Sequence, residues 1–532
     1  MTNVDVLIVG AGPSGLMLSL ELAAQKISFR IVDSTSIRSD KSRALVLHPR
    51  TLELLNRHGI AQDFIDRGVL NMMVRIFANQ KFVFENDFGT VSFPDTMYHG
   101  PLMISQADIE SILDELLLKQ GVKVERPVTA EEILQDENGV TAILRNQDGS
   151  KEIIRCKYVV GCDGPHSVVR KSAGLKFEGA AYPQDFILAD VRMKWQAKEC
   201  LHIFIGSGFM MVFPMKNNIW RLVCSRNPSE TDVEPTLENF QQRINKLLPE
   251  PTELFDPTWM TRFKLHHRIA DNYRAGRMFL AGDAAHIHSP AGGQGMNTGI
   301  HDAVNLGWKL ASVIRDDRDE TLLESYNIER RRIGQILLQG TDKIFEFMAT
   351  TNPVYLFLRN YILPLIMPWA MSIPGRRALA YRFVSELGIR YRQSPIVGQT
   401  STWKGALKGG DRAPDGKLLR GDTEITVHSL LGACSHSLLL FSGIGENRAS
   451  AEDLRKAESP LLNDIKRPIL TSKITTSSLQ SNQILDSEGR VHQLFGFTAP
   501  GFVLIRPDGH IEFIGSIASL DELIVWKEEQ KL

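Results

Sequence analysis

The first 33 residues constrain the fold most, because they read as a strand, a glycine-rich turn, a helix and a second strand. The apolar run 4–9 ends at a Gly-Ala-Gly-Pro-Ser-Gly turn at 10–15, and apolar residues then recur at helical spacing over 16–25. A second apolar run, 29–32, stops at Asp33. This order is typical of the βαβ unit that binds a dinucleotide. The sequence therefore predicts an α/β chain built on a Rossmann-like domain.

Each residue type in this turn meets a physical need. The first glycine permits a tight bend, the second lets the backbone approach a diphosphate, and the third lets the helix pack against the strand. The helix start presents unpaired N–H groups to phosphates, and the acid after the second strand can accept hydrogen bonds from an adenosine ribose. We expect these residues to bind the cofactor: Gly10, Gly12, Pro13, Ser14, Gly15 and Asp33.

A second glycine-rich region follows the apolar run 278–281, hundreds of residues later. It holds a Gly-Asp turn at 282–283 and the segment 292–297, Gly-Gly-Gln-Gly-Met-Asn. A carboxylate here can accept a hydrogen bond from a ribityl hydroxyl, and backbone amides can face the flavin edge that is negative when reduced. The alternative is an aspartate that caps an ordinary helix. The candidate cofactor residues are Gly282, Asp283, Pro290, Gly293, Gly295, Met296 and Asn297.

Three more residues are candidates for cofactor binding, and each could instead have an ordinary structural role. Asp163 stands in a third turn, Gly-Cys-Asp-Gly at 161–164, which lies near the diphosphate or is a surface turn. Gln106 precedes an expected helix and can hydrogen-bond the cofactor or face solvent. Arg43 can neutralise phosphate charge or be an ordinary surface arginine. A nicotinamide cofactor needs only the first turn, so three remote turns favour FAD, which is held along its whole length.

The order and spacing of the three turns resemble the group A FAD-dependent aromatic hydroxylases, in the branch of phenol hydroxylase and the aromatic-polyketide hydroxylases. The resemblance covers about 1–345 through specific motifs and extends more loosely to the C-terminus. It implies that NADPH or NADH reduces FAD and leaves, and that reduced flavin traps dioxygen as a C4a-hydroperoxide. It further implies oxygen transfer to a small aromatic, phenolic substrate. Flavin epoxidation, Baeyer–Villiger oxygenation or a non-catalytic flavin-binding role remain alternatives.

Substrate-activating residues are harder to find in the sequence. A base or cation near a phenol oxygen makes the ring a better nucleophile. On the strand expected at 219–226, side-chain alternation places Arg221 on the face opposite to that of Trp220 and Leu222. We take Arg221 as the first candidate for holding a phenolate. His202 is the second, and Pro290 is a candidate rigid wall beside the flavin ring. The alternative for Arg221 is an exposed strand arginine, and the alternative for His202 is a histidine with a structural role. Two histidines lie between the Gly-Asp turn at 282–283 and the glycine-rich segment 292–297, and we interpret both as structural: His286 and His288.

The chain is expected to divide into four parts. The resemblance implies that the last is a thioredoxin-like α/β domain, but its redox motif is missing, since Gly443–Glu446 contains no cysteine. We therefore expect a structural or dimer-forming role for it, so a homodimer is possible. The expected parts are a discontinuous FAD-binding domain (1–70, 101–176 and 270–345), a mainly β substrate domain (71–100 and 177–269), a helical segment (346–394) and the thioredoxin-like domain (395–532).

Composition excludes several other classes of protein. The formal net charge is −1 with no long basic run, so we expect no nucleic-acid partner. The five cysteines never form a C-x-x-C pair, which argues against a disulfide framework or a metal site and favours a reducing compartment. The apolar stretch 360–373 is interrupted by two prolines and is shorter than the ~20 residues a membrane span needs. We expect a buried helix or interfacial patch there, no transmembrane segment, and a cytoplasmic protein.

Overall fold

The computed structural model describes most of the chain. Two candidate site residues, Arg43 and Pro290, lie outside the described residues, so the structure does not test them. The positions that are not described are 1, 39–43, 72, 88–89, 91–92, 196–197, 207, 227–234, 251, 290–291, 317, 349, 351, 374, 447, 464–468, 477–483 and 530–532.

The first sheet brings the three predicted turns to one edge. Its central strands are parallel, in the order β17-β10-β1-β2. Val9 pairs with Gly161, and Gly161 pairs with Leu280, so the carboxyl ends of three strands are level. Because each predicted turn follows one of these ends, the turns lie together. The strands are β1 (Thr2–Val9), β2 (Phe29–Val32), β10 (Lys151–Gly161) and β17 (Met278–Leu280), with antiparallel additions β8 (Thr129–Asp136), β9 (Gly139–Arg145) and β16 (Arg274–Ala275).

Helices cover this sheet and form its apolar core. The helix after the first turn is buried along most of its length, because it packs against both α4 and α7. It carries apolar residues with few polar ones, as a helix covered on more than one side requires. The helices of this region are α1 (Pro13–Ala24), α2 (Pro49–Arg57), α3 (Ala61–Arg67), α4 (Gln106–Lys119), α5 (Val168–Ser172) and α7 (Gly295–Asp316). A small sheet joins β3 (Val46–Leu47), β4 (Val69–Leu70) and β7 (Leu102–Met103).

A second sheet has the order β18-β15-β11-β14-β13-β12-β5-β6. The expected substrate segments 71–100 and 177–269 share it, since β5 pairs with β12. Its edge strand β18 follows the Gly-Asp turn directly, a connection that the sequence did not indicate. The strands are β5 (Met73–Ala78), β6 (Lys81–Asp87), β11 (Phe177–Met193), β12 (Leu201–Ile205), β13 (Phe209–Met215), β14 (Ile219–Ser225), β15 (Leu254–Ala270) and β18 (His286–Ile287), with α6 (Leu237–Leu247) packed nearby.

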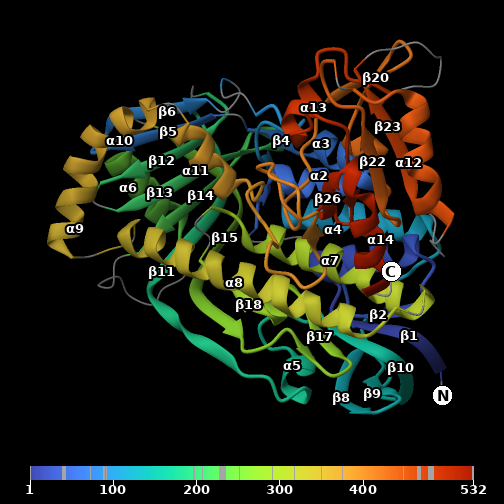
Figure 1. Ribbon diagram of the computed structural model, residues 1–532. Helices are drawn as coiled ribbons and strands as arrows, with labels where there is room; N and C mark the ends of the chain where they lie inside the picture. The colour runs from blue at the N-terminus through green and yellow to red at the C-terminus, as the bar shows by residue number, and fades with distance from the viewer. Residues whose placement is uncertain are drawn as a thin grey trace.

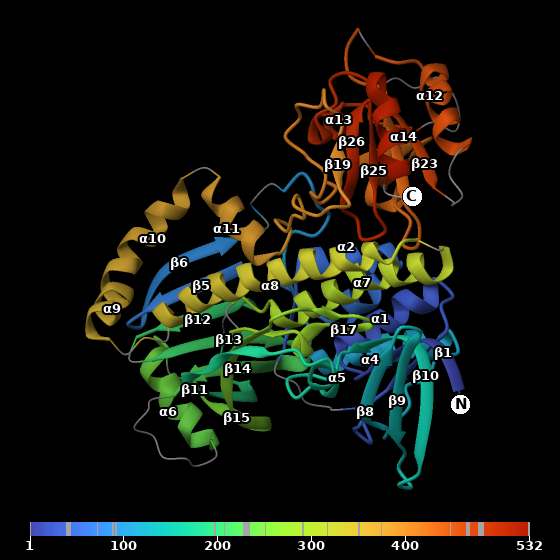
Figure 2. The same ribbon diagram turned by 60° about the horizontal axis from the view of Figure 1, so that its bottom comes forward.

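A long helix, α8 (Thr321–Met348), runs across the molecule towards a helical group beyond β6 (Figures 1 and 2). This group comprises α9 (Pro353–Phe357), α10 (Leu363–Ser372) and α11 (Arg376–Val384). Its apolar side chains are exposed, with Leu365 at 76% and Trp369 at 65%, so the expectation of a buried helix there does not hold. In the part of the chain that is described, the run Pro353–Ser372 alone has the length and apolarity of a membrane span, which is weak evidence taken singly.

The C-terminal part is a mixed α/β unit that lies apart from α9 and α10 (Figure 2). Two strands of this unit, β25 and β26, form an antiparallel hairpin. Arg506 in its turn donates two hydrogen bonds to Glu329 of α8, which joins this unit to the rest of the chain. The strands are β19 (Gly398–Gln399), β20 (Lys417–Arg420), β21 (Thr423–Thr426), β22 (Ser437–Phe441), β23 (Leu470–Thr475), β24 (Ile484–Leu485), β25 (Gly501–Ile505) and β26 (Ile511–Ser516); the helices are α12 (Ala451–Asn463), α13 (Arg490–Phe495) and α14 (Leu520–Glu529).

Candidate active site

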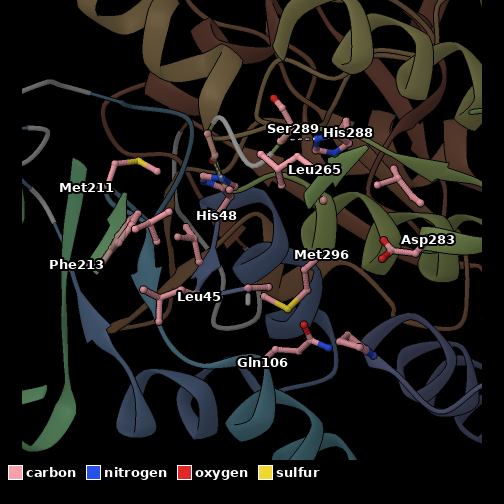
Figure 3. Close-up of a pocket in the computed structure, with 18 of the residues that line it drawn as sticks. Leu45, His48, Gln106, Met211, Phe213, Leu265, Asp283, His288, Ser289 and Met296 are labelled. Carbon is pink, nitrogen blue, oxygen red and sulfur yellow. Dashed lines mark hydrogen bonds between the residues drawn. The ribbon is translucent and has the colours of Figure 1, made fainter. Parts of the chain in front are cut away.

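The three turns surround one cavity of about 960 Å³ (Figure 3). Each turn contributes to its wall, as do the second sheet and α11. The volume lies in the range of cofactor and substrate pockets. Figure 3 shows Gln106, Met296, Asp283 and His288 around the same space. The lining residues from the turns are Gly12, Pro13, Ser14, Cys162, Gly164, Pro165, Gly282, Asp283, Gly292, Gly293, Gly295 and Met296.

The glycines of the turns have two different tasks. Gly10 has φ +101°, and a Cβ there would overlap the Cys162 backbone. A Cβ on Gly15 would overlap the Gly10 carbonyl oxygen, so both glycines let chain segments touch. Gly12 instead faces open space, with no heavy atom within 4 Å of the position a Cβ would take. This is the room that a diphosphate needs beside a helix start.

Two charged residues hold the turns in place. Arg170 donates to the carbonyl oxygens of Ala284 at 2.8 Å and Pro165 at 2.7 Å, so it links the second and third turns. Asp302 accepts a hydrogen bond from the Gly282 N–H at 3.0 Å. In the sequence Asp302 looks like an ordinary helix residue, because its contacts depend on tertiary structure.

Asp33 and Asp163 both hold backbone in place. Asp33 accepts from the Ala11 N–H at 2.7 Å and so shapes the first turn. Arg126, which the sequence did not indicate, donates to the Ala11 carbonyl oxygen at 3.2 Å. Asp163 accepts from the Val168 N–H at 2.7 Å and caps α5, and burial raises the pKa of its carboxyl. The residues on either side of Asp163 line the cavity. Its Oδ2 atom binds the start of the helix, and its buried Oδ1 atom has no hydrogen-bond partner among the described residues.

Asp283 and Gln106 present polar atoms to the cavity. The Asp283 side chain is exposed on the cavity wall and makes no hydrogen bond to the described residues, and desolvation by the protein around it raises the pKa of its carboxyl. A carboxylate that opens onto the cavity without a protein partner can accept hydrogen bonds from the hydroxyl groups of a ligand. Gln106 is oriented by its donation to Glu110 at 2.8 Å.

Asn297 supports the glycine loop at 292–296 through its side chain. Its amide donates to the carbonyl oxygens of Gly293 and Val46, each at 2.8 Å. Its side-chain oxygen accepts from the His48 N–H at 2.8 Å. The side chain is fully buried and its hydrogen-bonding atoms are used by the protein. The side chain of Asn297 therefore supports the loop that lines the cavity, and its expected cofactor contact stays a prediction.

The second sheet supplies an apolar wall, and Arg221 lies within it. The expected alternation on β14 is present, with Arg221 and Val223 towards the cavity. Arg221 is bound by Asp190 through two hydrogen bonds of 2.7 and 2.8 Å, so its charge is already balanced. It is therefore not the uncompensated cation that a phenolate would need. The apolar lining residues of this sheet are Val74, Leu188, Leu201, Ile203, Met211, Phe213, Val223, Trp259, Phe263, Leu265 and Ile287.

His202 lies on the other face of the same sheet. Its neighbours Leu201 and Ile203 line the cavity, so alternation turns His202 away. The ring packs 4.5 Å from Trp195, and Nε2 lies 3.0 Å from the Lys198 carbonyl oxygen. Burial lowers its pKa to about 4. The expectation that His202 activates the substrate therefore does not hold.

Comparison with known proteins agrees with this site. Residues 3–341 match the family model described as an FAD binding domain. The chain is 32% identical to 6-methylpretetramide 4-monooxygenase of Streptomyces rimosus, over 95% of this chain and 90% of that one. It is 31% identical to pentachlorophenol 4-monooxygenase of Sphingobium chlorophenolicum, over 95% and 93%. The solved structure of OxyS anhydrotetracycline hydroxylase from Streptomyces rimosus superposes with a TM-score of 0.75, at 26% identity, over 99% and 98%.

The chain belongs to this family of FAD-binding aromatic hydroxylases. It is an FAD-dependent monooxygenase that acts on aromatic substrates, with NAD(P)H as the reductant typical of the family. The open space at Gly12 would accept the diphosphate of FAD, and the Asp283 carboxylate, which has no partner among the described residues, would accept its ribityl hydroxyls.

Proposed function

We propose that the substrate is a phenolic compound of polyketide type, hydroxylated at the expense of NADPH or NADH and dioxygen. The observation that carries this proposal is the apolar wall of the second sheet, which continues directly from the glycine loop at 292–296 within one cavity. A flat aromatic molecule held against such a wall would lie next to the cofactor ring. Three relatives are named for tetracycline-type or phenolic substrates, which supports the same class.

The chain's own residues would bind and orient the reactants. The amides at the start of α1 would hold the diphosphate, and Asp283 would accept hydrogen bonds from the ribityl hydroxyls. The amides of Gly293 and Gly295 would face the edge of the flavin that becomes negative. When bound, FAD supplies the transfer of electrons from the nicotinamide to dioxygen. The apolar wall would exclude water from the reacting ring.

The roles of the larger parts are also proposed. The division at 70, 100, 176, 269, 345 and 394 is supported by the separate sheets of these segments. We assign 395–532 as a thioredoxin-like domain without redox activity, because Cys434 is its only cysteine. The buried contacts of Arg506 with Glu329 support a structural task for it.

The test is to purify the holoprotein, identify its chromophore, and screen monocyclic and polycyclic phenols for stimulated NAD(P)H oxidation. The expected product gains one oxygen atom from ¹⁸O₂ and remains aromatic by NMR. An epoxide or a lactone would assign one of the alternative oxygenations instead. Binding of FAD without any substrate-stimulated oxidation across the panel would contradict the proposed substrate class.

A further inference from the structure

His288 is one of four histidines that line the cavity, and the others are His48, His266 and His286. It lines the cavity, is 9% exposed, and stands at the junction of the glycine loop and the second sheet (Figure 3). Its Cε1 and Nε2 atoms lie 3.7 Å from the position a Cβ on Gly295 would take. This edge of the imidazole therefore faces the loop that is expected to hold the flavin ring.

The hydrogen bonds fix which nitrogen carries the proton. Nδ1 of His288 lies 2.9 Å from the Ser289 carbonyl oxygen, which can only accept, so Nδ1 must be the donor. Nε2 then carries a lone pair. Among the described residues it has no hydrogen-bond partner, although it is buried. Such an acceptor costs free energy unless a ligand donates to it.

The surroundings keep the ring neutral. Burial, followed by the neighbouring His286 ring at 6.2 Å, lowers the pKa of His288 to about 4. Asp342 of α8 acts in the other direction, but it accepts hydrogen bonds from His267 and Tyr182. A neutral imidazole keeps a lone pair on Nε2 that can accept a proton, whereas a charged ring has no such lone pair.

We propose that His288 is a catalytic residue whose Nε2 accepts the phenolic proton of the substrate. This inference rests on the proposed phenolic substrate. As the ring carbon attacks the electrophilic oxygen that FAD, NAD(P)H and dioxygen supply, the phenol O–H bond breaks and its electron pair moves into the ring. The proton is held at Nε2. When the resulting ring ketone loses its C–H proton to water and becomes aromatic again, Nε2–H returns a proton to the ketone oxygen, and the imidazole ends neutral.

Two substitutions separate the functions of the two nitrogens. His288→Asn keeps an N–H near the Nδ1 position for Ser289 but has no atom at Nε2. His288→Gln can place an amide oxygen near Nε2, which accepts a hydrogen bond but is not a base. His202→Asn is the matched control, because His202 is also buried and of low pKa but lies on the far face of the sheet.

The measurement is binding to the oxidised holoenzyme, without NAD(P)H, of 1-naphthol and its methyl ether, 1-methoxynaphthalene. We expect the wild type to bind the naphthol about tenfold more tightly, as one hydrogen bond provides. The Asn variant should lose this preference, while the Gln and His202→Asn variants keep it. In turnover with any phenol found to be hydroxylated, the Gln variant should be at least about 100-fold slower.

Several outcomes would overturn the assignment. A preference that persists in the Asn variant, or no naphthol preference or binding in the wild type, would exclude Nε2 as the phenol acceptor. A changed flavin spectrum in the Asn variant without phenol, with the preference intact, would assign Nε2 to the flavin instead. If the Asn variant does not retain FAD, a Gln variant with full turnover would count against the role. Because binding is measured without turnover, failure of the proposed hydroxylation remains distinguishable.

Discussion

The carboxylate of Asp302 accepts a hydrogen bond from the backbone N–H of Gly282 at 3.0 Å. The same carboxylate accepts from His286 Nε2 at 2.8 Å and from Arg330 Nε at 2.7 Å. Although burial alone would raise the pKa of Asp302, Arg330 and His286 lower it, so the group is ionised. One fully buried charge on α7 thus holds the turn that presents Asp283 to the cofactor.

Replacement of Asp302 by asparagine should destabilise the protein by about 3–5 kcal/mol, because it leaves the buried Arg330 charge without its partner. The free energy of unfolding in urea and the dissociation constant of FAD measure the effect. Glu115→Gln is the control, since Glu115 pairs with Arg67 on the surface and should cost less than about 1 kcal/mol. Equal effects of the two substitutions would contradict this role for Asp302.

Gly12→Ala should weaken FAD binding by about tenfold or more while changing the stability of the apoprotein by about 1 kcal/mol or less. The new methyl group would meet no protein atom but would enter the expected diphosphate space. Gly15→Ala should instead destabilise the apoprotein by about 1–3 kcal/mol, because its methyl group would overlap the Gly10 carbonyl oxygen. Calorimetry of the apoproteins and FAD fluorescence titrations distinguish the two cases.

Asp283→Ala should raise the FAD dissociation constant by about 10- to 100-fold, because hydrogen bonds to a charged group contribute roughly 1.5–3 kcal/mol. In the free protein burial raises the pKa of Asp283, and hydroxyl donors would favour its ionised form. FAD affinity of the wild type should therefore fall as pH is lowered through that pKa. Titrations at several pH values test this, and an equally steep decline in the alanine variant would refute it.

Glu386→Gln should remove a loss of stability at neutral to alkaline pH. Burial raises the pKa of Glu386 to about 8, and its carboxyl lies 3.2 Å from His301 Nδ1. Since the folded pKa exceeds the unfolded value of about 4.3, this stabilisation is complete at low pH and is lost as pH rises through about 8. Unfolding free energies from about pH 6 to about pH 8 should fall relative to the variant by up to ~1.4 kcal/mol per pH unit. Parallel pH profiles would show that Glu386 is already ionised.

Arg221→Met should destabilise the protein by about 3–5 kcal/mol, because Asp190 would be left buried without its partner. The double variant Arg221→Met, Asp190→Leu should recover most of that loss, as paired replacement of buried ions often does. Urea unfolding measures both effects. If the double variant is stable but no longer binds phenols, Arg221 has the substrate role that its pairing argues against.

Local pattern determined much of this protein. The glycine turn at 10–15, the Gly-Asp turn at 282–283 and the alternation of β14 follow from backbone geometry and from side-chain period, which neighbouring residues specify. Only the tertiary structure decided what those side chains meet. Asp302 beneath Gly282 and Asp190 beside Arg221 are partners brought together by packing across long separations in the chain. The Nε2 atom of His288, which has no partner among the described residues, is a further case, because only the folded chain decides which donors and carbonyl groups surround a lone pair.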